Sequence, residues 1–133
     1  MRKSLPPQLW LAVLFAASST GVQALQVLDA RDGVSVAAKL SLKEPTRIKV
    51  EGAAIGEVFG NVWQDKTNPG GDVIVETDPG KGELYIRPVS ASATKPINLF
   101  VSTKQATYTL LLHPVDIPGD TIVLRDRTPR VPR

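Results

Sequence analysis

Apolar and polar residues alternate through most of the chain after residue 24, which is the period of strands that bury one face. The longest run has apolar side chains at Val34, Val36, Ala38, Leu40 and Leu42. The same alternation recurs in residues 47–51, 83–87, 97–101 and 108–112, and residues 73–77 are more continuously apolar. We therefore expect one buried set of side chains: Ile48, Val50, Leu84, Ile86, Ile97, Leu99, Val101, Tyr108, Leu110 and Leu112.

Turn-forming residues separate these segments. Glu44-Pro45 divides two predicted strands, and the sequence Asp-Pro-Gly-Lys-Gly at residues 78–82 predicts a hairpin turn. Pro88 and Pro96 bracket a Ser/Ala/Thr loop, and residues 114–119 form a last corner before a closing strand. The pattern predicts an all-β protein, an antiparallel β-sandwich of about seven to nine short strands. A membrane β-barrel is disfavoured because its strands need about 9–11 alternating residues each.

The first 24 residues have the composition of a signal peptide. Basic residues at positions 2 and 3 precede an apolar run over residues 9–17, and small residues at Val22 and Ala24 favour cleavage between Ala24 and Leu25. The apolar run is too short for a membrane-spanning helix, which needs roughly 20 residues. The alternative is a buried N-terminal helix. We expect residues 1–24 to be removed on export to the bacterial periplasm.

Composition restricts the partners of the exported chain. It has no cysteine, so we expect stability from an apolar core, and Leu25 gives no thiol for a lipid anchor. The formal net charge of +3 resides at the two ends, because residues 25–124 hold ten basic and twelve acidic side chains. A nearly neutral domain lacks the basic surface that nucleic acids require. We therefore expect no direct binding of nucleic acid.

The residue types that usually carry catalysis are sparse. His113 is the single histidine and has no obvious partner for metal binding or proton transfer. Ser92 and Lys95 have the Ser-x-x-Lys spacing of some acyl-transfer enzymes, but that spacing works on a helical turn, which the flanking prolines disfavour. Gly80 and Gly82 indicate a turn, because no helix follows to bind phosphate. The pairs Asp29 with Asp32 and Asp116 with Asp120 are too sparse for a calcium loop. We predict no enzyme, no cofactor and no metal.

Four side chains are candidates for contact with a protein partner. Trp63 lies in the long loop 60–71, and tryptophan is enriched at interface hot spots. The favoured alternative is that Trp63 folds back onto the end of the sandwich. Arg125, Arg127 and Arg130 belong to a basic C-terminal segment, which is suited either to an acidic neighbour or to a solvated Pro/Arg-rich tail over residues 127–133. An exposed strand edge could also accept a partner strand, although the sequence does not indicate which edge.

Six segments, in order, carry a resemblance to a known family. They are Thr46–Gly52, Ile55–Phe59, Gly82–Pro88, Pro96–Ser102, Tyr108–Leu112 and Val115–Ile122. Together they resemble the N-terminal domain of TraK, the secretin-like conjugal transfer protein of F-type type IV secretion systems. On this basis we assign residues 25–126 to one TraK N-terminal-like domain.

The resemblance implies a structural role and not an enzymatic one. It implies a periplasmic β domain that assembles into a ring in the outer-membrane core complex, with a TraV-like lipoprotein and a TraB-like scaffold as partners. Family members usually continue into a second β domain, so this sequence is expected to be a fragment, one half of a split protein, or a shorter functional form. The alternative function is a stand-alone periplasmic binding module or chaperone-like adaptor for pilus assembly.

Overall fold

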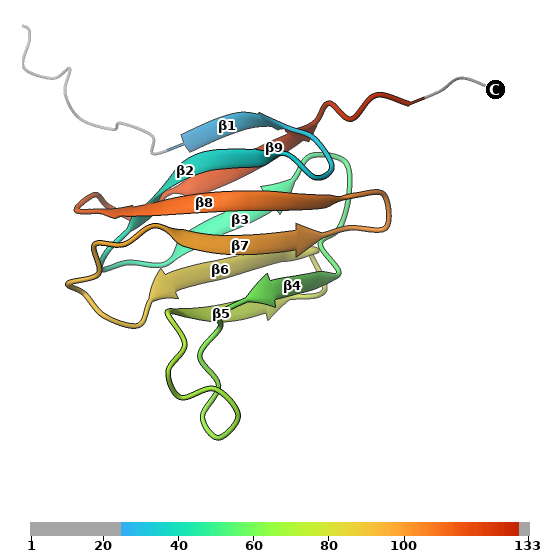
Figure 1. Ribbon diagram of the computed structural model, residues 1–133. Helices are drawn as coiled ribbons and strands as arrows, with labels where there is room; N and C mark the ends of the chain where they lie inside the picture. Colours follow the sequence, from blue (N-terminus) through green and yellow to red (C-terminus); the bar gives the residue numbers. More distant parts are fainter. Residues whose placement is uncertain (1–24, 131–133) are drawn as a thin grey trace, which may run out of the picture.

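The computed structural model describes residues 25–130, which fold into a two-layered β-sandwich (Figure 1). The predicted signal peptide, residues 1–24, lies outside these described residues. The nine strands of the described region are β1 (Leu25–Ala30), β2 (Ser35–Ser41), β3 (Thr46–Val50), β4 (Glu57–Gly60), β5 (Val73–Asp78), β6 (Glu83–Pro88), β7 (Ile97–Ser102), β8 (Thr107–Val115) and β9 (Thr121–Asp126).

Strand directions are mixed in both sheets. The five-stranded sheet has the order β1-β9-β3-β6-β5, and the four-stranded sheet has the order β2-β8-β7-β4. β9 runs parallel to both β1 and β3, and β2 runs parallel to β8. The predicted β-sandwich of seven to nine strands is confirmed. Its antiparallel directions, however, hold only for the pairs β5–β6, β7–β8, β3–β6 and β4–β7.

The core lies between the inner faces of the two sheets, as the alternation predicts. All ten side chains expected to point inward are buried, from Ile48 in β3 to Leu112 in β8. Ala30, Val73, Ile122 and Leu124 belong to the same buried cluster. Burying a large aliphatic side chain contributes about 1.5–3 kcal/mol, so this single cluster accounts for the stability of a domain without disulfides. The parallel neighbours β1, β3 and β9 each contribute side chains to this core.

The hairpin turn lies where the sequence predicts it, but the last corner begins two residues later than predicted, because β8 continues through Val115. The hairpin between β5 and β6 closes with a hydrogen bond of 2.8 Å from Gly82 N to Asp78 O, and Gly82 has a φ of 69°. That positive φ favours glycine. Pro114 is instead part of β8, where Val115 O accepts a hydrogen bond from the N–H of Leu42, the residue that follows β2. The backbone of Pro114 therefore faces the β7 side, where β7 has not yet begun because its first residue Ile97 pairs with Leu112, so no N–H is needed at position 114.

Candidate functional site

The loop between β4 and β5 projects from the sandwich and is held by its own hydrogen bonds (Figure 1). Gln64 and Asn68 exchange backbone hydrogen bonds of 3.0 and 2.8 Å, which close a small hairpin within the loop. The Asn68 amide also donates to Val62 O at 2.7 Å and to Asn61 Oδ1 at 2.8 Å. The predicted long loop is thus an ordered projection, built by the local side-chain bonds that asparagine makes readily.

Trp63 begins this projection, and its side chain is 37% exposed. It is not part of the buried core cluster. Its backbone N donates to Val73 O at 2.7 Å, which joins the loop to the free side of β5. The backbone of Gly71 packs against it so closely that a Cβ at position 71 would lie 2.2 Å from Trp63 N. The structure presents the indole at the surface, and a partner contact by Trp63 stays a prediction.

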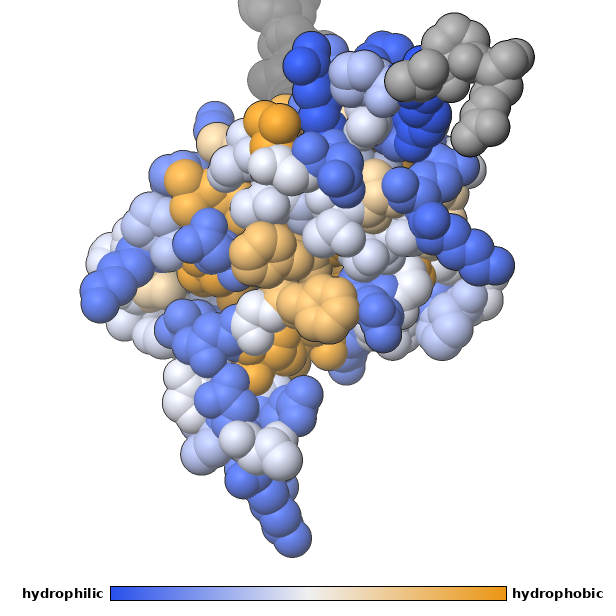
Figure 2. Space-filling model, turned by 45° about the vertical axis from the view of Figure 1, so that its right-hand side comes forward, coloured by the Kyte–Doolittle hydropathy of each residue, from blue (hydrophilic) through white to orange (hydrophobic). Residues whose placement is uncertain are grey.

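Two aromatic rings lie on the outer face of the four-stranded sheet. Phe59 in β4 and Phe100 in β7 are direct cross-strand neighbours, and they are 51% and 40% exposed. Figure 2 shows apolar side chains gathered on the face above the projecting, hydrophilic loop. We call Phe59 and Phe100 the aromatic pair. Exposed aromatic residues that adjoin one another are typical of protein interfaces. In the sequence, the one sign of this surface is an apolar residue, Phe100, at a position where the alternation of residues 97–101 expects a polar one.

The three candidate arginines all bind acidic side chains of their own domain. Arg125 lies 3.6 Å from Glu51, Arg127 lies 3.1 Å from Asp29, and Arg130 lies 2.8 Å from Asp126. The pairs of Arg125 and Arg127 are largely exposed, where an ion pair is worth about 0–1 kcal/mol, so an acidic partner could replace them at little cost, whereas the Asp126 side chain bound by Arg130 is only 12% exposed. A role of these arginines in partner binding therefore stays a prediction.

Asp126 organises the residues that follow β9. Its carboxylate accepts hydrogen bonds from Thr128 N at 2.7 Å and from Arg130 Nη2 at 2.8 Å. These bonds, led by those from Thr128, hold the pKa of Asp126 well below its usual range. Two further bonds fasten the segment, since Arg127 N donates to Ala30 O and Asp32 N donates to the Thr128 hydroxyl. Residues 127–130 consequently lie along the turn between β1 and β2.

A bidentate ion pair crosses the outer face of the five-stranded sheet. Arg47 Nε and Nη2 donate to the two Glu83 carboxylate oxygens at 2.8 and 3.0 Å, and Lys49 Nζ lies 3.8 Å from Glu83. The hydrogen bonds from Arg47 lower the pKa of Glu83, and the same pairing raises the pKa of Arg47. Glu83 is 8% exposed, so its charge depends on this partner. We assign the pair a structural role.

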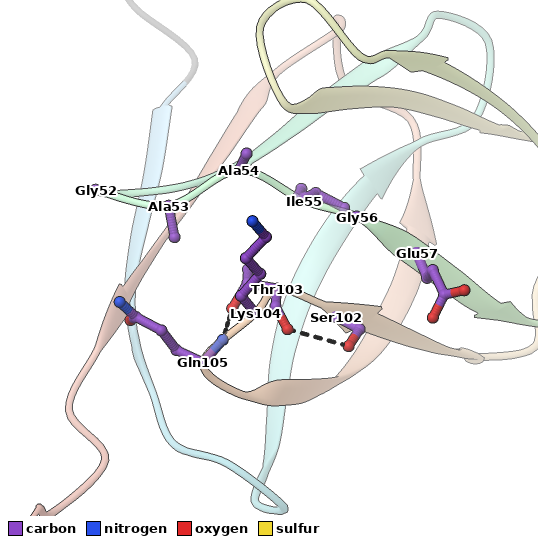
Figure 3. A pocket seen from close by; sticks show the side chains of 10 residues that line it. All are labelled: Gly52, Ala53, Ala54, Ile55, Gly56, Glu57, Ser102, Thr103, Lys104 and Gln105. Atoms are coloured by element: carbon purple, nitrogen blue, oxygen red, sulfur yellow. Dashed lines mark hydrogen bonds between the residues drawn. The ribbon is translucent and has the colours of Figure 1, made fainter.

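A hollow of about 470 Å³ lies between residues 52–57 and the turn joining β7 to β8 (Figure 3). Figure 3 shows the Lys104 side chain pointing across it toward the facing segment at Ala54. Gln105 N donates to the Thr103 hydroxyl at 3.1 Å, which shapes the turn. Glu57 is the one acidic group in the lining, and no histidine or cysteine accompanies it. The lining offers no nucleophile with an adjacent base.

The remaining catalytic candidates are dispersed. His113 lies in β8 opposite Lys39 of β2. Ser92 shares a hydrogen bond of 2.9 Å with Ser90 in a loop without helical structure, so the Ser92–Lys95 spacing lacks the turn it would need. Within residues 25–130 no group of three or more histidine, cysteine or acidic side chains is arranged to hold a metal ion. Over the same residues no helix is long and apolar enough to cross a membrane.

Comparison with known proteins agrees with the sequence resemblance. A family model described as the TraK N-terminal domain matches residues 29–131, which is most of the chain. No curated protein sequence matches it. TraK proteins are structural, periplasmic components of the machinery for conjugal DNA transfer. The chain therefore belongs to the TraK N-terminal domain family and is a TraK-related conjugal transfer protein.

Proposed function

We propose that this protein is a structural subunit of the periplasmic core complex of a type IV secretion system. In that complex it assembles into a ring with copies of itself. A TraB-like scaffold and a TraV-like lipoprotein bind the ring and hold it at the outer membrane. The observation that carries the proposal is the family match over residues 29–131, because TraK proteins are structural components of conjugation.

The surface chemistry supports an assembling subunit. The aromatic pair offers a contact area on the outer sheet face, and Trp63 is 37% exposed in the loop that follows β4. Aromatic side chains supply a large share of binding energy at protein interfaces because they bury much area at low entropic cost. The arginine pairs at the C-terminal end are exposed and can exchange their partners. Two separate surfaces are thus available for contacts in a ring.

Co-expression tests the proposal. The chain is produced in the periplasm together with its TraB-like and TraV-like partners, extracted in detergent and imaged by electron microscopy. We expect co-purification of all three proteins and ring-shaped particles. A chain that stays monomeric and purifies with neither partner would sink the proposal.

A matched pair of variants localises the contact. We expect Phe59→Ser combined with Phe100→Ser to reduce co-purification, because the exposed aromatic area is lost while the core is untouched. Val89→Ser removes an apolar side chain of similar exposure away from this face and should have no effect. Co-purification of pilin subunits in place of the scaffold would instead favour the chaperone-like adaptor.

A further inference from the structure

The sandwich has an open groove between β4 and β5 at one edge. Its volume is about 440 Å³. Figure 1 shows both strands at the same edge of the molecule, in different layers, with the ordered loop projecting between them. The lining is uncharged and consists of Val58, Phe59, Gly60, Val62, Gln64, Thr67, Asn68, Val75 and Thr77. The groove thus has an apolar floor of valines, bounded by amide and hydroxyl groups of the loop.

The backbone of β5 offers unpaired hydrogen-bonding groups to this groove. β5 is an outer strand of its sheet. Val73 O points away from β6, since it accepts a hydrogen bond from Trp63 N, whereas Asp72 O faces β6 and accepts from Val89 N. Backbone groups alternate in direction along a strand, so those of Val75 and Thr77 point to the open side. Val62 already pairs there in parallel with Val73, and a second strand could continue that pairing.

The edge strand β2 is protected in a way that β5 is not. The backbone of Lys39 in β2 is bonded by the side chain of Gln26, and Ser41 N donates to the Thr46 hydroxyl. Covering an edge in this manner prevents a foreign strand from pairing. Among the described residues, no side-chain hydrogen bond reaches the backbone of Val75 or Thr77. The structure thus closes one edge and leaves the β5 edge open.

Charge around the groove indicates the kind of segment that fits. Glu76 and Asp78 alternate with the groove-lining residues of β5, so they lie on its outward face. Neither has an ion-pair partner within residues 25–130. A strand paired with β5 would place every second side chain over the valine floor and the others beside these two carboxylates. Opposite charges directly across a strand pair contribute roughly 0.2–1 kcal/mol each.

We propose that the β5 edge binds an extended segment of a partner protein in which apolar residues alternate with lysine or arginine. The segment adds a strand to the five-stranded sheet through Val75 and Thr77, with its apolar side chains in the groove and its basic side chains beside Glu76 and Asp78. This goes beyond the proposed ring assembly, because it names the edge, the geometry and the chemistry of the bound segment.

Peptide binding to the purified exported chain tests this directly. The probes are the hexapeptide Lys-Val-Lys-Val-Lys-Val and its counterpart with glutamate in place of lysine, both with blocked ends. Trp63 is the single tryptophan of residues 25–133 and lies beside the groove, so its fluorescence reports binding. We expect the lysine peptide to bind at least about tenfold more tightly than the glutamate peptide at low salt. Equal affinity for the two peptides would overturn the proposal.

Backbone pairing is tested with a proline variant. Thr77→Pro removes the N–H that points to the groove, and it leaves the β6 side intact because the backbone of Thr77 does not face β6. We expect an affinity loss of about tenfold or more, whereas Thr77→Val should bind as the parent does. Near-ultraviolet circular dichroism verifies that both variants are folded. Unchanged binding by a folded Thr77→Pro variant would exclude strand addition at this edge.

Two further outcomes separate this inference from the ring proposal. Self-association that Thr77→Pro abolishes would mean that a second copy occupies the edge, which overturns the assignment to a partner protein. The peptide assay needs neither scaffold nor lipoprotein. A core complex that assembles although neither peptide binds would therefore contradict this inference alone, and peptide binding without assembly would contradict the ring alone.

Discussion

The side-chain amide of Gln26 binds both backbone groups of Lys39. Gln26 Oε1 accepts from Lys39 N at 2.8 Å, and Gln26 Nε2 donates to Lys39 O at 2.9 Å. The same Nε2 donates to Asp120 Oδ2 at 2.8 Å. Gln26 lies in β1 and Lys39 in β2, which belong to different sheets. One side chain thus joins the two layers and covers the edge of β2.

Replacing Gln26 tests the importance of this link. We expect Gln26→Ala to lower the free energy of unfolding by about 0.5–1.5 kcal/mol, because the two backbone groups of Lys39, which lie at an exposed edge, lose their side-chain partner. Urea denaturation at pH 7 measures the change. Gln26→Glu keeps the acceptor for Lys39 N but cannot donate to Lys39 O, and it faces Asp120, so it should not restore stability. A full rescue by glutamate would contradict the two-sided bond.

The ion pair between Arg47 and Glu83 predicts an acid-sensitive contribution to stability. Because its pKa is lowered in the folded protein, Glu83 contributes stability above its unfolded pKa of about 4.3, and this is lost as pH falls through the lower folded value. We expect Glu83→Gln to unfold about 1–2 kcal/mol more easily at pH 7. Urea denaturation should find the variant and the parent converging as the pH falls below about 4. A difference that stays constant with pH would rule out this explanation.

Gly71 sets the position of the projecting loop. A methyl group at this position would lie 2.2 Å from Trp63 N and 2.4 Å from Trp63 Cα, so the two backbone segments must separate in Gly71→Ala. Forced displacements of this kind cost about 1–3 kcal/mol. We expect a shifted Trp63 fluorescence maximum and faster proteolysis within residues 61–72. Gly70→Ala is the matched control, since its methyl group would meet no atom within 4 Å. Identical behaviour of the two variants would contradict the close packing.

The hydroxyl of Tyr108 is buried without a hydrogen bond to any described residue, although Asp126 and Thr103 are near it. Burial raises the pKa of Tyr108, as expected for a phenol removed from water. A buried polar group without a partner is unfavourable. We therefore expect Tyr108→Phe to leave the free energy of unfolding unchanged or to raise it by up to about 1 kcal/mol. Thermal denaturation provides the measurement, and a clear loss of stability would reveal a hydrogen bond to Asp126.

The residue pattern of β1 made this strand difficult to predict from the sequence. Its outward residues Leu25 and Val27 are apolar and exposed, while its inward-facing Gln26 is polar. Only Leu28 and Ala30 of this strand follow the expected alternation, with Leu28 half-buried against the core and Ala30 within it, so the local pattern identifies the strand weakly. Only the backbone of Lys39, 13 positions later, makes a glutamine acceptable there.

The candidate site was predicted less completely than the fold. Trp63 and the arginines were identified by residue type, and the structure places them at two separated regions, the projecting loop and the end of β9. The aromatic pair was not predicted, because Phe59 and Phe100 are 41 positions apart and become neighbours only through the pairing of β4 with β7. The open edge of β5 likewise depends on which strand ends the sheet.

Taken by itself, the sequence determined the local structure: alternation defined the inward faces, glycine and proline defined the turns, and the ordered segments defined the family. These properties depend on residues a few positions apart, so they can be read along the chain. The tertiary structure alone decided the parallel pairings of β1, β3 and β9, the covered edge of β2 and the open edge of β5. Such pairings join distant residues, and the packing of a shared core, which no local pattern encodes, selects among them.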